Sequence, residues 1–307
     1  MFGRKVVDKC VREGAWLSVC IPSAVLSGCA GPSVLSPHGT VAAANRAIML
    51  NSLGVMLVIV IPTIAGVGLF AWWFRASNSK ARYRPNFAFS GRLELLIWSI
   101  PFLVILFLGG IIWIGSHQLD PYKPLASQKK PLEVQVVSLD WKWLFLYPEL
   151  QLASVNELVV PTGTPVHLSL TSGSVMNSFF VPQLGSMVAV MYGMVTQLHL
   201  MADRDGDFYG QSTQFSGQGF ADMNFKVRSV SPAAFSAWTT SVRQSGGSLD
   251  LKSYQALEAP SQNVPPTTFG QVDPALFARI VSGAPDNLPA HARHSSTRGR
   301  EAASIAR

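Results

Sequence analysis

The sequence predicts a mixed membrane and β protein: a hairpin of two transmembrane helices, then an antiparallel β-sandwich, then a short helical arm. Of the 307 residues, 48% are hydrophobic and 13% are charged. This composition is too apolar for a purely soluble protein and too polar for a multi-span transporter. The apolar residues form long runs before residue 118 and alternate with polar residues after it, which indicates membrane helices followed by strands.

The first 28 residues have the form of a secretory signal. Four basic side chains precede the short apolar run 16–28, which is too brief to cross a bilayer. The run ends in Leu26-Ser27-Gly28-Cys29, which is similar to the cleavage box of bacterial lipoproteins. We therefore expect cleavage before Cys29 and lipidation of its thiol. A plain signal peptide and an uncleaved anchor are the alternatives.

The chain has three cysteines, and all of them lie in this region: Cys10, Cys20 and Cys29. Cleavage before Cys29 removes two of them, and acylation blocks the third. We therefore expect no thiolate in the mature chain for a metal, a disulfide or catalysis.

Residues 29–118 are expected to form the lipidated N-terminus and the transmembrane hairpin. The apolar runs 47–74 and 93–115 are each long enough to cross about 30 Å of hydrocarbon as a helix. The loop 75–92 between them carries five basic side chains and no acidic one, which places it in the cytoplasm. The N-terminus and everything after the second span then lie outside. Much of the formal net charge of +7 comes from this loop, and no basic patch interleaved with aromatic residues indicates a nucleic-acid partner.

Glu94 is the acidic residue at the cytoplasmic entrance of the second span. A carboxylate in the first turn of a helix can simply interact favourably with the helix dipole. The alternative is that it gathers protons for a buried relay.

Residues 119–230 are expected to form the outer β domain. Short runs of alternating apolar and polar residues are separated by Gly and Pro turns, which is typical of an antiparallel sandwich. The clearest runs are residues 133–137, 157–160, 166–170, 197–200 and 223–227. His167 and His199 each sit alone in such a run, so we expect neither to bind a metal.

Residues 231–283 are expected to form the helical arm. Ser231 and Pro232 are a capping residue and a first-position proline, and Gly246-Gly247 closes that helix. Two shorter helices are predicted at 249–257 and 273–281. The tail 284–307 is small, polar and Arg-rich, and we expect it to be disordered.

Residues 209–223 read YGQSTQFSGQGFADM and have the frame of a metal loop. The frame resembles the copper loop of subunit II of the haem-copper respiratory oxidases, where Tyr-Gly-Gln is followed by Cys, an acidic residue, Cys, His and Met. The positions that correspond to the ligands are Asn177 and Phe220 for the two His, Ser212 and Ser216 for the two Cys, Gln214 for the acidic residue, and Met223, which alone is retained. An ordinary Gly-rich β-loop with a chance likeness is the alternative.

Serine hydroxyls are hard ligands that stay protonated at neutral pH, so they cannot replace the two soft thiolates of a dinuclear copper centre. We therefore expect no metal and no cofactor in this chain. The segment 140–147, DWKWLFLY, is similar to an aromatic stretch that helps electrons enter from cytochrome c in the copper-bearing members. Without copper, Trp141 and Trp143 are expected to pack against the sandwich and the neighbouring subunit.

Together these features resemble subunit II of the cytochrome bo-type ubiquinol oxidases, the copper-less branch of the family. The resemblance implies a cupredoxin-like sandwich in a bacterial inner membrane complex that oxidises ubiquinol, reduces O2 to water and pumps protons. It implies haems and copper in subunit I, further membrane subunits and bound lipid as partners, and no cytochrome c. It also places Glu94 at the mouth of a proton path.

Two other readings of the sequence remain. A lipoprotein assembly or binding module without an enzyme partner would purify without haem. A subunit II of a menaquinol oxidase of related build is the other, since none of the residues described above reads the quinone headgroup.

Overall fold

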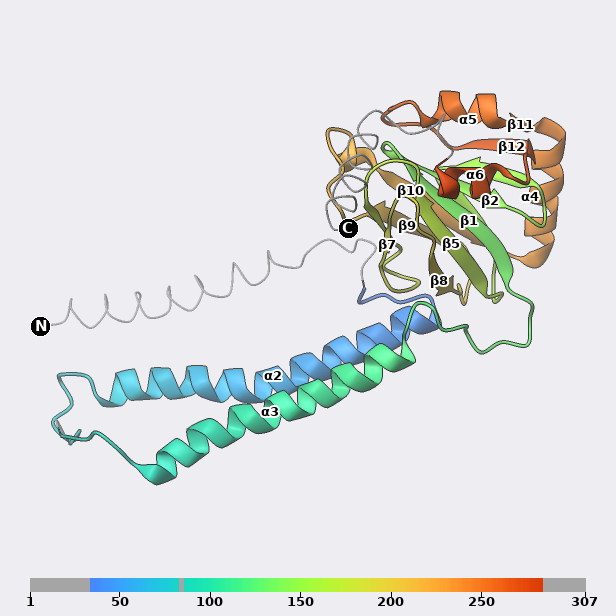
Figure 1. Cartoon of the computed structure of the whole chain (residues 1–307). Coiled ribbons are helices and arrows are strands. Elements are labelled where there is room, and N and C mark those ends of the chain that lie inside the picture. The colour runs from blue at the N-terminus through green and yellow to red at the C-terminus, as the bar shows by residue number, and fades with distance from the viewer. Residues whose placement is uncertain (1–33, 83–85, 284–307) are drawn as a thin grey trace, which may run out of the picture. The chain divides into compact units, whose positions relative to one another are not determined.

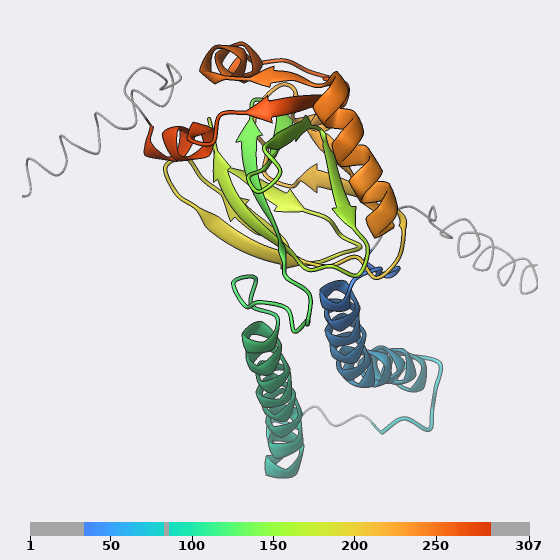
Figure 2. The same cartoon turned by 90° about the vertical axis from the view of Figure 1, so that its right-hand side faces the viewer.

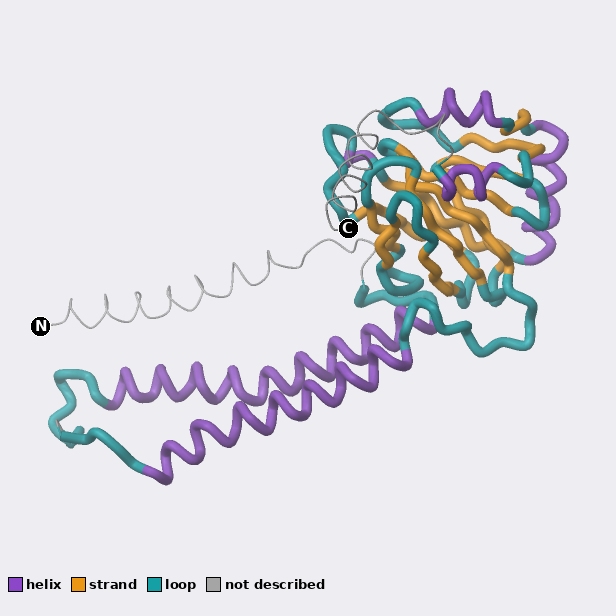
Figure 3. The backbone as a smooth tube through the Cα atoms, viewed as in Figure 1, coloured by secondary structure: helices purple, strands orange, loops and turns teal. Residues whose placement is uncertain are grey.

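The computed structural model describes residues 34–82 and 86–283. The predicted signal peptide, the lipidation site Cys29 and the predicted disordered tail lie outside these residues. The described chain contains two long helices, a domain built mainly of strands, and short helices around that domain (Figures 1 and 3).

The two predicted spans are found as α2 (Thr40–Trp73) and α3 (Gly91–Gln118). Both are long and apolar enough to cross a membrane. α2 begins seven residues before its predicted run, because the Ala-rich segment 40–46 continues the helix through the polar Asn45 and Arg46. α3 extends beyond its predicted run by Gly91 and Arg92 at the start and by Ser116 to Gln118 at the end. The two helices come close near residue 115, where a Cβ on Gly115 would lie 2.7 Å from Ile48 Cδ1.

The β domain consists of a seven-stranded and a five-stranded sheet. The seven-stranded sheet has the order β11-β12-β3-β2-β1-β5-β8, and the other has the order β4-β10-β9-β6-β7. The strands are β1 (Leu132–Leu139), β2 (Lys142–Tyr147), β3 (Leu152–Val155), β4 (Glu157–Pro161), β5 (Val166–Ser172), β6 (Asn177–Phe180), β7 (Val188–Val190), β8 (Thr196–Leu200), β9 (Gly206–Ser212), β10 (Asn224–Val230), β11 (Gly247–Leu249) and β12 (Thr267–Val272).

The predicted sandwich is confirmed, but its strands are not all antiparallel. The pairs β1–β5, β4–β10 and β11–β12 are parallel. The first arises because the chain crosses to the second sheet at β4 before it returns as β5 beside β1. Short-range alternation predicts a strand and its buried face, but it carries no information about such crossovers.

The main core lies between the two sheets and is rich in aromatic rings. Trp143 of β2 is fully buried, with its ring centroid 5.4 Å from those of both Phe179 and Phe225. Phe179 and Phe225 stack at 4.9 Å. Such contacts contribute beyond the apolar area that they bury. Trp143 therefore packs inside the sandwich.

A second core lies on the other face of the seven-stranded sheet. Side chains of β1, β2 and β3 meet Leu249, Tyr254, Leu276 and Phe277 of the C-terminal arm there. These strands are thus covered on both faces. This explains why β2, KWLFLY, is buried at all six positions and does not alternate.

The C-terminal arm contains α4 (Pro232–Ser245), α5 (Leu251–Glu258) and α6 (Leu276–Ser282), close to the three predicted helices. Ser231 caps α4 by accepting from the backbone N–H of Ala234 at 3.3 Å, and Asp250 caps α5 by accepting from that of Ser253 at 2.8 Å. Figure 2 shows α4 standing beside the sheets. The arm also supplies β11 and β12, which the sequence did not predict, and β12 pairs with β3.

Candidate functional site

The metal-loop frame connects two paired strands. β9 ends at Ser212, a 3₁₀ turn covers Phe220–Asp222, and β10 starts at Asn224. Gly210 of the YGQ frame faces the ring of Phe225, and a Cβ there would lie 2.2 Å from that ring. The glycine is therefore required by the close packing of the loop's base on the aromatic core.

Asn177, Ser212 and Ser138 form a buried hydrogen-bond chain at the base of the loop. Ser212 Oγ donates to Asn177 Oδ1 at 3.0 Å, and Asn177 Nδ2 donates to Ser138 Oγ at 2.8 Å. The three side chains are all buried, and they come from β6, β9 and β1. The fold thus brings together two of the predicted ligand-equivalent positions.

Ser216 and Met223 form a second pair, with Ser216 Oγ 3.7 Å from Met223 Sδ. Met223 is buried, and its carbonyl accepts from the backbone N–H of Ser212 at 3.3 Å. Gln214 is exposed, and its carbonyl accepts from Ser212 Oγ. Phe220 packs edge-on against Phe215 at 5.7 Å. The loop therefore brings Met223 close to the two serines and leaves the side chain of Gln214 in solvent.

These side chains do not fit a dinuclear copper centre. The side chains at these positions offer two amides, two hydroxyls and one thioether as metal ligands, and Phe220 offers none. Soft thiolates would be needed to bridge two copper ions. Within residues 34–82 and 86–283, no group of three or more His, Cys, Asp or Glu side chains could hold a metal.

Trp141, just before β2, packs against the loop at residues 216–219. Its backbone has φ 63°, and its indole Nε1 donates to the carbonyl of Ser216 at 3.0 Å. A Cβ on Gly219 would lie 2.4 Å from the ring, so only glycine allows this contact. The ring supports the loop from the side of the sandwich.

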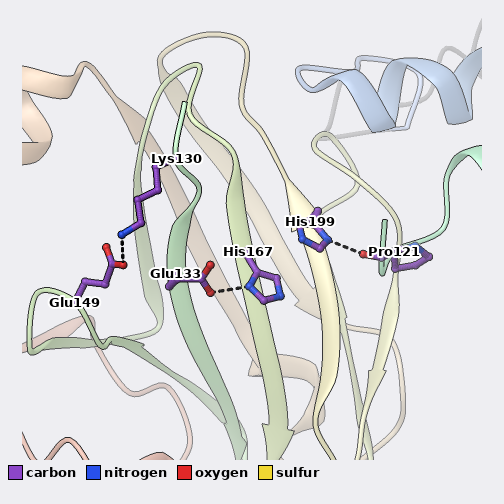
Figure 4. Close-up of polar contacts among 6 residues, drawn as sticks. All are labelled: Pro121, Lys130, Glu133, Glu149, His167 and His199. Atoms are coloured by element: carbon purple, nitrogen blue, oxygen red, sulfur yellow. Dashed lines mark hydrogen bonds and ion pairs between the residues drawn. The ribbon is translucent and has the colours of Figure 1, made fainter. Parts of the chain in front are cut away.

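The histidines correct our expectation that each would sit alone. His167 and His199 are paired in the register of β5 and β8, and their rings stack at 4.6 Å. His167 Nδ1 lies 2.6 Å from Glu133 Oε2, and His199 Nδ1 lies 3.0 Å from the carbonyl of Pro121 (Figure 4). The sequence separates Glu133 and His167 by 34 residues. Only the parallel pairing of β1 with β5 brings them together, and local patterns do not show it.

Glu94 lies in the first turn of α3 and is exposed in the isolated chain. Its backbone N–H donates to the carbonyl of Ser90 at 3.0 Å. This position is compatible with a favourable interaction with the helix dipole and with a role in collecting protons.

The β domain and the arm both match known families. Residues 130–230 match the model described as the periplasmic domain of cytochrome c oxidase subunit II, and residues 243–283 match the cytochrome oxidase aromatic-rich motif. The cytochrome bo(3) ubiquinol oxidase subunit 2 of Pseudomonas aeruginosa is 46% identical over 87% of this chain and 80% of its own length. The chain belongs to the oxidase subunit II family.

Further members of the family support the same assignment. The ubiquinol oxidase subunit 2 of Acetobacter aceti is 48% identical over 91% of this chain and 89% of its own length. The quinol oxidase subunit 2 of Bacillus subtilis is 32% identical over 80% and 77%. This oxidase subunit therefore belongs to a complex with a subunit I. Its periplasmic family domain and its two helices that can span a bilayer indicate an inner-membrane protein.

Proposed function

We propose that this oxidase subunit is the non-redox subunit II of a proton-pumping terminal ubiquinol oxidase, with quinol oxidation and O2 reduction carried out in subunit I. The observation that carries the proposal is the donor set of the loop 212–223, which cannot hold the copper of the cytochrome c oxidases. The ubiquinol oxidase names of relatives at 46% and 48% identity support it.

A subunit II without a copper relay is consistent with quinol, and not a soluble protein, as the electron donor. A soluble one-electron protein must deliver its electron through a centre on the outer domain. Quinol dissolves in the bilayer and can reach subunit I directly. The outer domain of this subunit then contributes to assembly and stability of the complex.

The proposed topology has both chain ends and the β domain on the periplasmic side. The basic loop 75–92 supports it through the positive-inside rule. The predicted lipidation of Cys29 would require the same orientation.

The experiment that tests the proposal is purification of the tagged chain in mild detergent from its native membrane, followed by optical spectra, metal content and oxygen uptake. We expect haem to co-purify and oxygen uptake to depend on ubiquinol, with no uptake from reduced cytochrome c. A colourless, metal-free preparation that keeps other partners would overturn the oxidase role and favour a lipoprotein binding module. Uptake with menaquinol alone would correct the substrate.

Replacing Glu94 with alanine should slow quinol-dependent oxygen uptake severalfold while leaving haem content and assembly unchanged. The reason is that a carboxylate at the cytoplasmic entrance of α3 can collect protons for a relay in subunit I. Oxygen uptake and haem content of the same preparation measure the two effects. Glu94→Asp, which keeps the carboxylate, is the matched control. If Glu94→Ala turns over like the parent, the residue serves only the helix dipole.

A further inference from the structure

We propose that residues 259–264 of the arm, here called the strap, hold the metal-free loop 213–222 in place and replace the cross-link that metal–ligand bonds supply in a copper-bearing loop. Metal ligation ties separate segments together and contributes directly to folding free energy. A loop without metal needs another restraint. The proposal rests on the loop's own donor set and on its contacts, and it holds whatever substrate the complex uses.

The first attachment of the strap is a buried lysine. Lys142 is the first residue of β2 and is fully buried. Its Nζ donates to the carbonyl of Ala259 at 2.8 Å and to Ser261 Oγ. A buried ammonium group is costly unless it is hydrogen-bonded. Desolvation also lowers the pKa of Lys142, which agrees with an enclosed group that depends on these two acceptors.

The second attachment is a pair of asparagines. Asn156, between β3 and β4, donates from Nδ2 to the carbonyl of Val264 at 2.8 Å. Asn263 donates from Nδ2 to Asp222 Oδ2 in the 3₁₀ turn of the loop at 3.3 Å. The strap is thus bonded to the sandwich at both of its ends and to the loop near its far end.

The loop packs against both Trp141 and the strap at Gly219. A Cβ on Gly219 would lie 2.4 Å from the Trp141 ring and 2.8 Å from Gln262 Cγ. Phe215 at the tip of the loop is 74% exposed, and its ring contact is with Phe220 of the same loop. Trp141 and the strap therefore contact the loop between Ser216 and Asp222. The exposed tip adds little stability of its own.

This arrangement predicts that loosening the strap will open the loop locally without unfolding the sandwich. Local openings of this kind are reported by amide hydrogen exchange. In the purified complex, Lys142→Met should speed exchange of the amides in 213–222 by at least about tenfold, the factor expected from loss of a charge-assisted hydrogen bond. Amides of the central strands β1 and β5 should be unchanged.

The matched control is Lys252→Met, the same substitution on the exposed face of α5, which should leave loop exchange unchanged. A second test variant is Asn263→Gly, because glycine tolerates the local φ of 52° and removes only the side-chain bond to Asp222. It should also speed loop exchange, and it decides the question if Lys142→Met fails to assemble. Loop amides that stay protected while strap amides exchange faster would overturn the proposal. Oxidase activity is a separate readout that tests the proposed function.

Discussion

Restoring the ligand types at the loop should turn this subunit into a copper protein, whereas the parent chain should bind no copper there. Asn177 and Ser212 already lie in contact at 3.0 Å, and Met223 lies 3.7 Å from Ser216. The two serines keep the four-residue spacing of the copper loop that the chain resembles, and thiolates there would supply the soft ligands that bridge two copper ions, with imidazoles completing the sites. The required changes are Asn177→His, Ser212→Cys, Gln214→Glu, Ser216→Cys and Phe220→His.

Copper content and visible absorption from thiolate-to-copper charge transfer measure the result. The control is the same variant with Ser212 retained, which lacks one bridging thiolate and should not form the dinuclear centre. Equal copper binding by the variant and this control would show that the loop backbone does not hold the bridging geometry. The resemblance to the copper loop would then be limited to sequence.

The ligand-equivalent residues could be proposed from the sequence because they follow a linear frame, and the structure brings Asn177 next to Ser212 and Ser216 next to Met223. Ser212, Ser216 and Met223 follow from their spacing within one hairpin, and Asn177 follows from the separate segment 174–182, SVMNSFFVP. The two membrane spans could also be predicted, since an apolar run of that length has few alternatives to a membrane helix. Their true ends were not, because residues such as Asn45, Arg46 and Ser116 continue a helix beyond the apolar run that predicts it.

Contacts between residues far apart in the chain could not be predicted from the sequence. Lys142 stands in an apolar strand, and nothing nearby shows that its partners are Ala259 and Ser261, more than 100 residues away. The stacked pair His167 and His199 depends on strand register. β12 was not predicted because it directly follows the proline-rich segment 259–266, whose prolines indicate a turn or an extended linker. In each case the sequence around a residue indicates its local conformation but does not identify its distant partner.

Replacing Asn156 with alanine should destabilise the β domain by about 3 kcal/mol. The asparagine is buried with φ 56°, and its Oδ1 accepts from the buried backbone N–H of Trp143 at 2.8 Å. Leaving that N–H without a partner costs about 1–3 kcal/mol. Holding a non-glycine residue without a short polar side chain in the left-handed region adds about 1–2 kcal/mol.

Hydrogen exchange of the slowest strand amides in the purified complex measures the loss, since those amides exchange through opening of the whole domain. Asn156→Gly separates the two causes, because it removes the side-chain bonds and keeps the backbone relaxed. We expect the glycine variant to be about 1 kcal/mol more stable than the alanine variant. Equal losses would assign the whole effect to the bonds with Trp143 and Val264, and a parent-like alanine variant would show that this asparagine does not stabilise the junction of the two sheets and the strap.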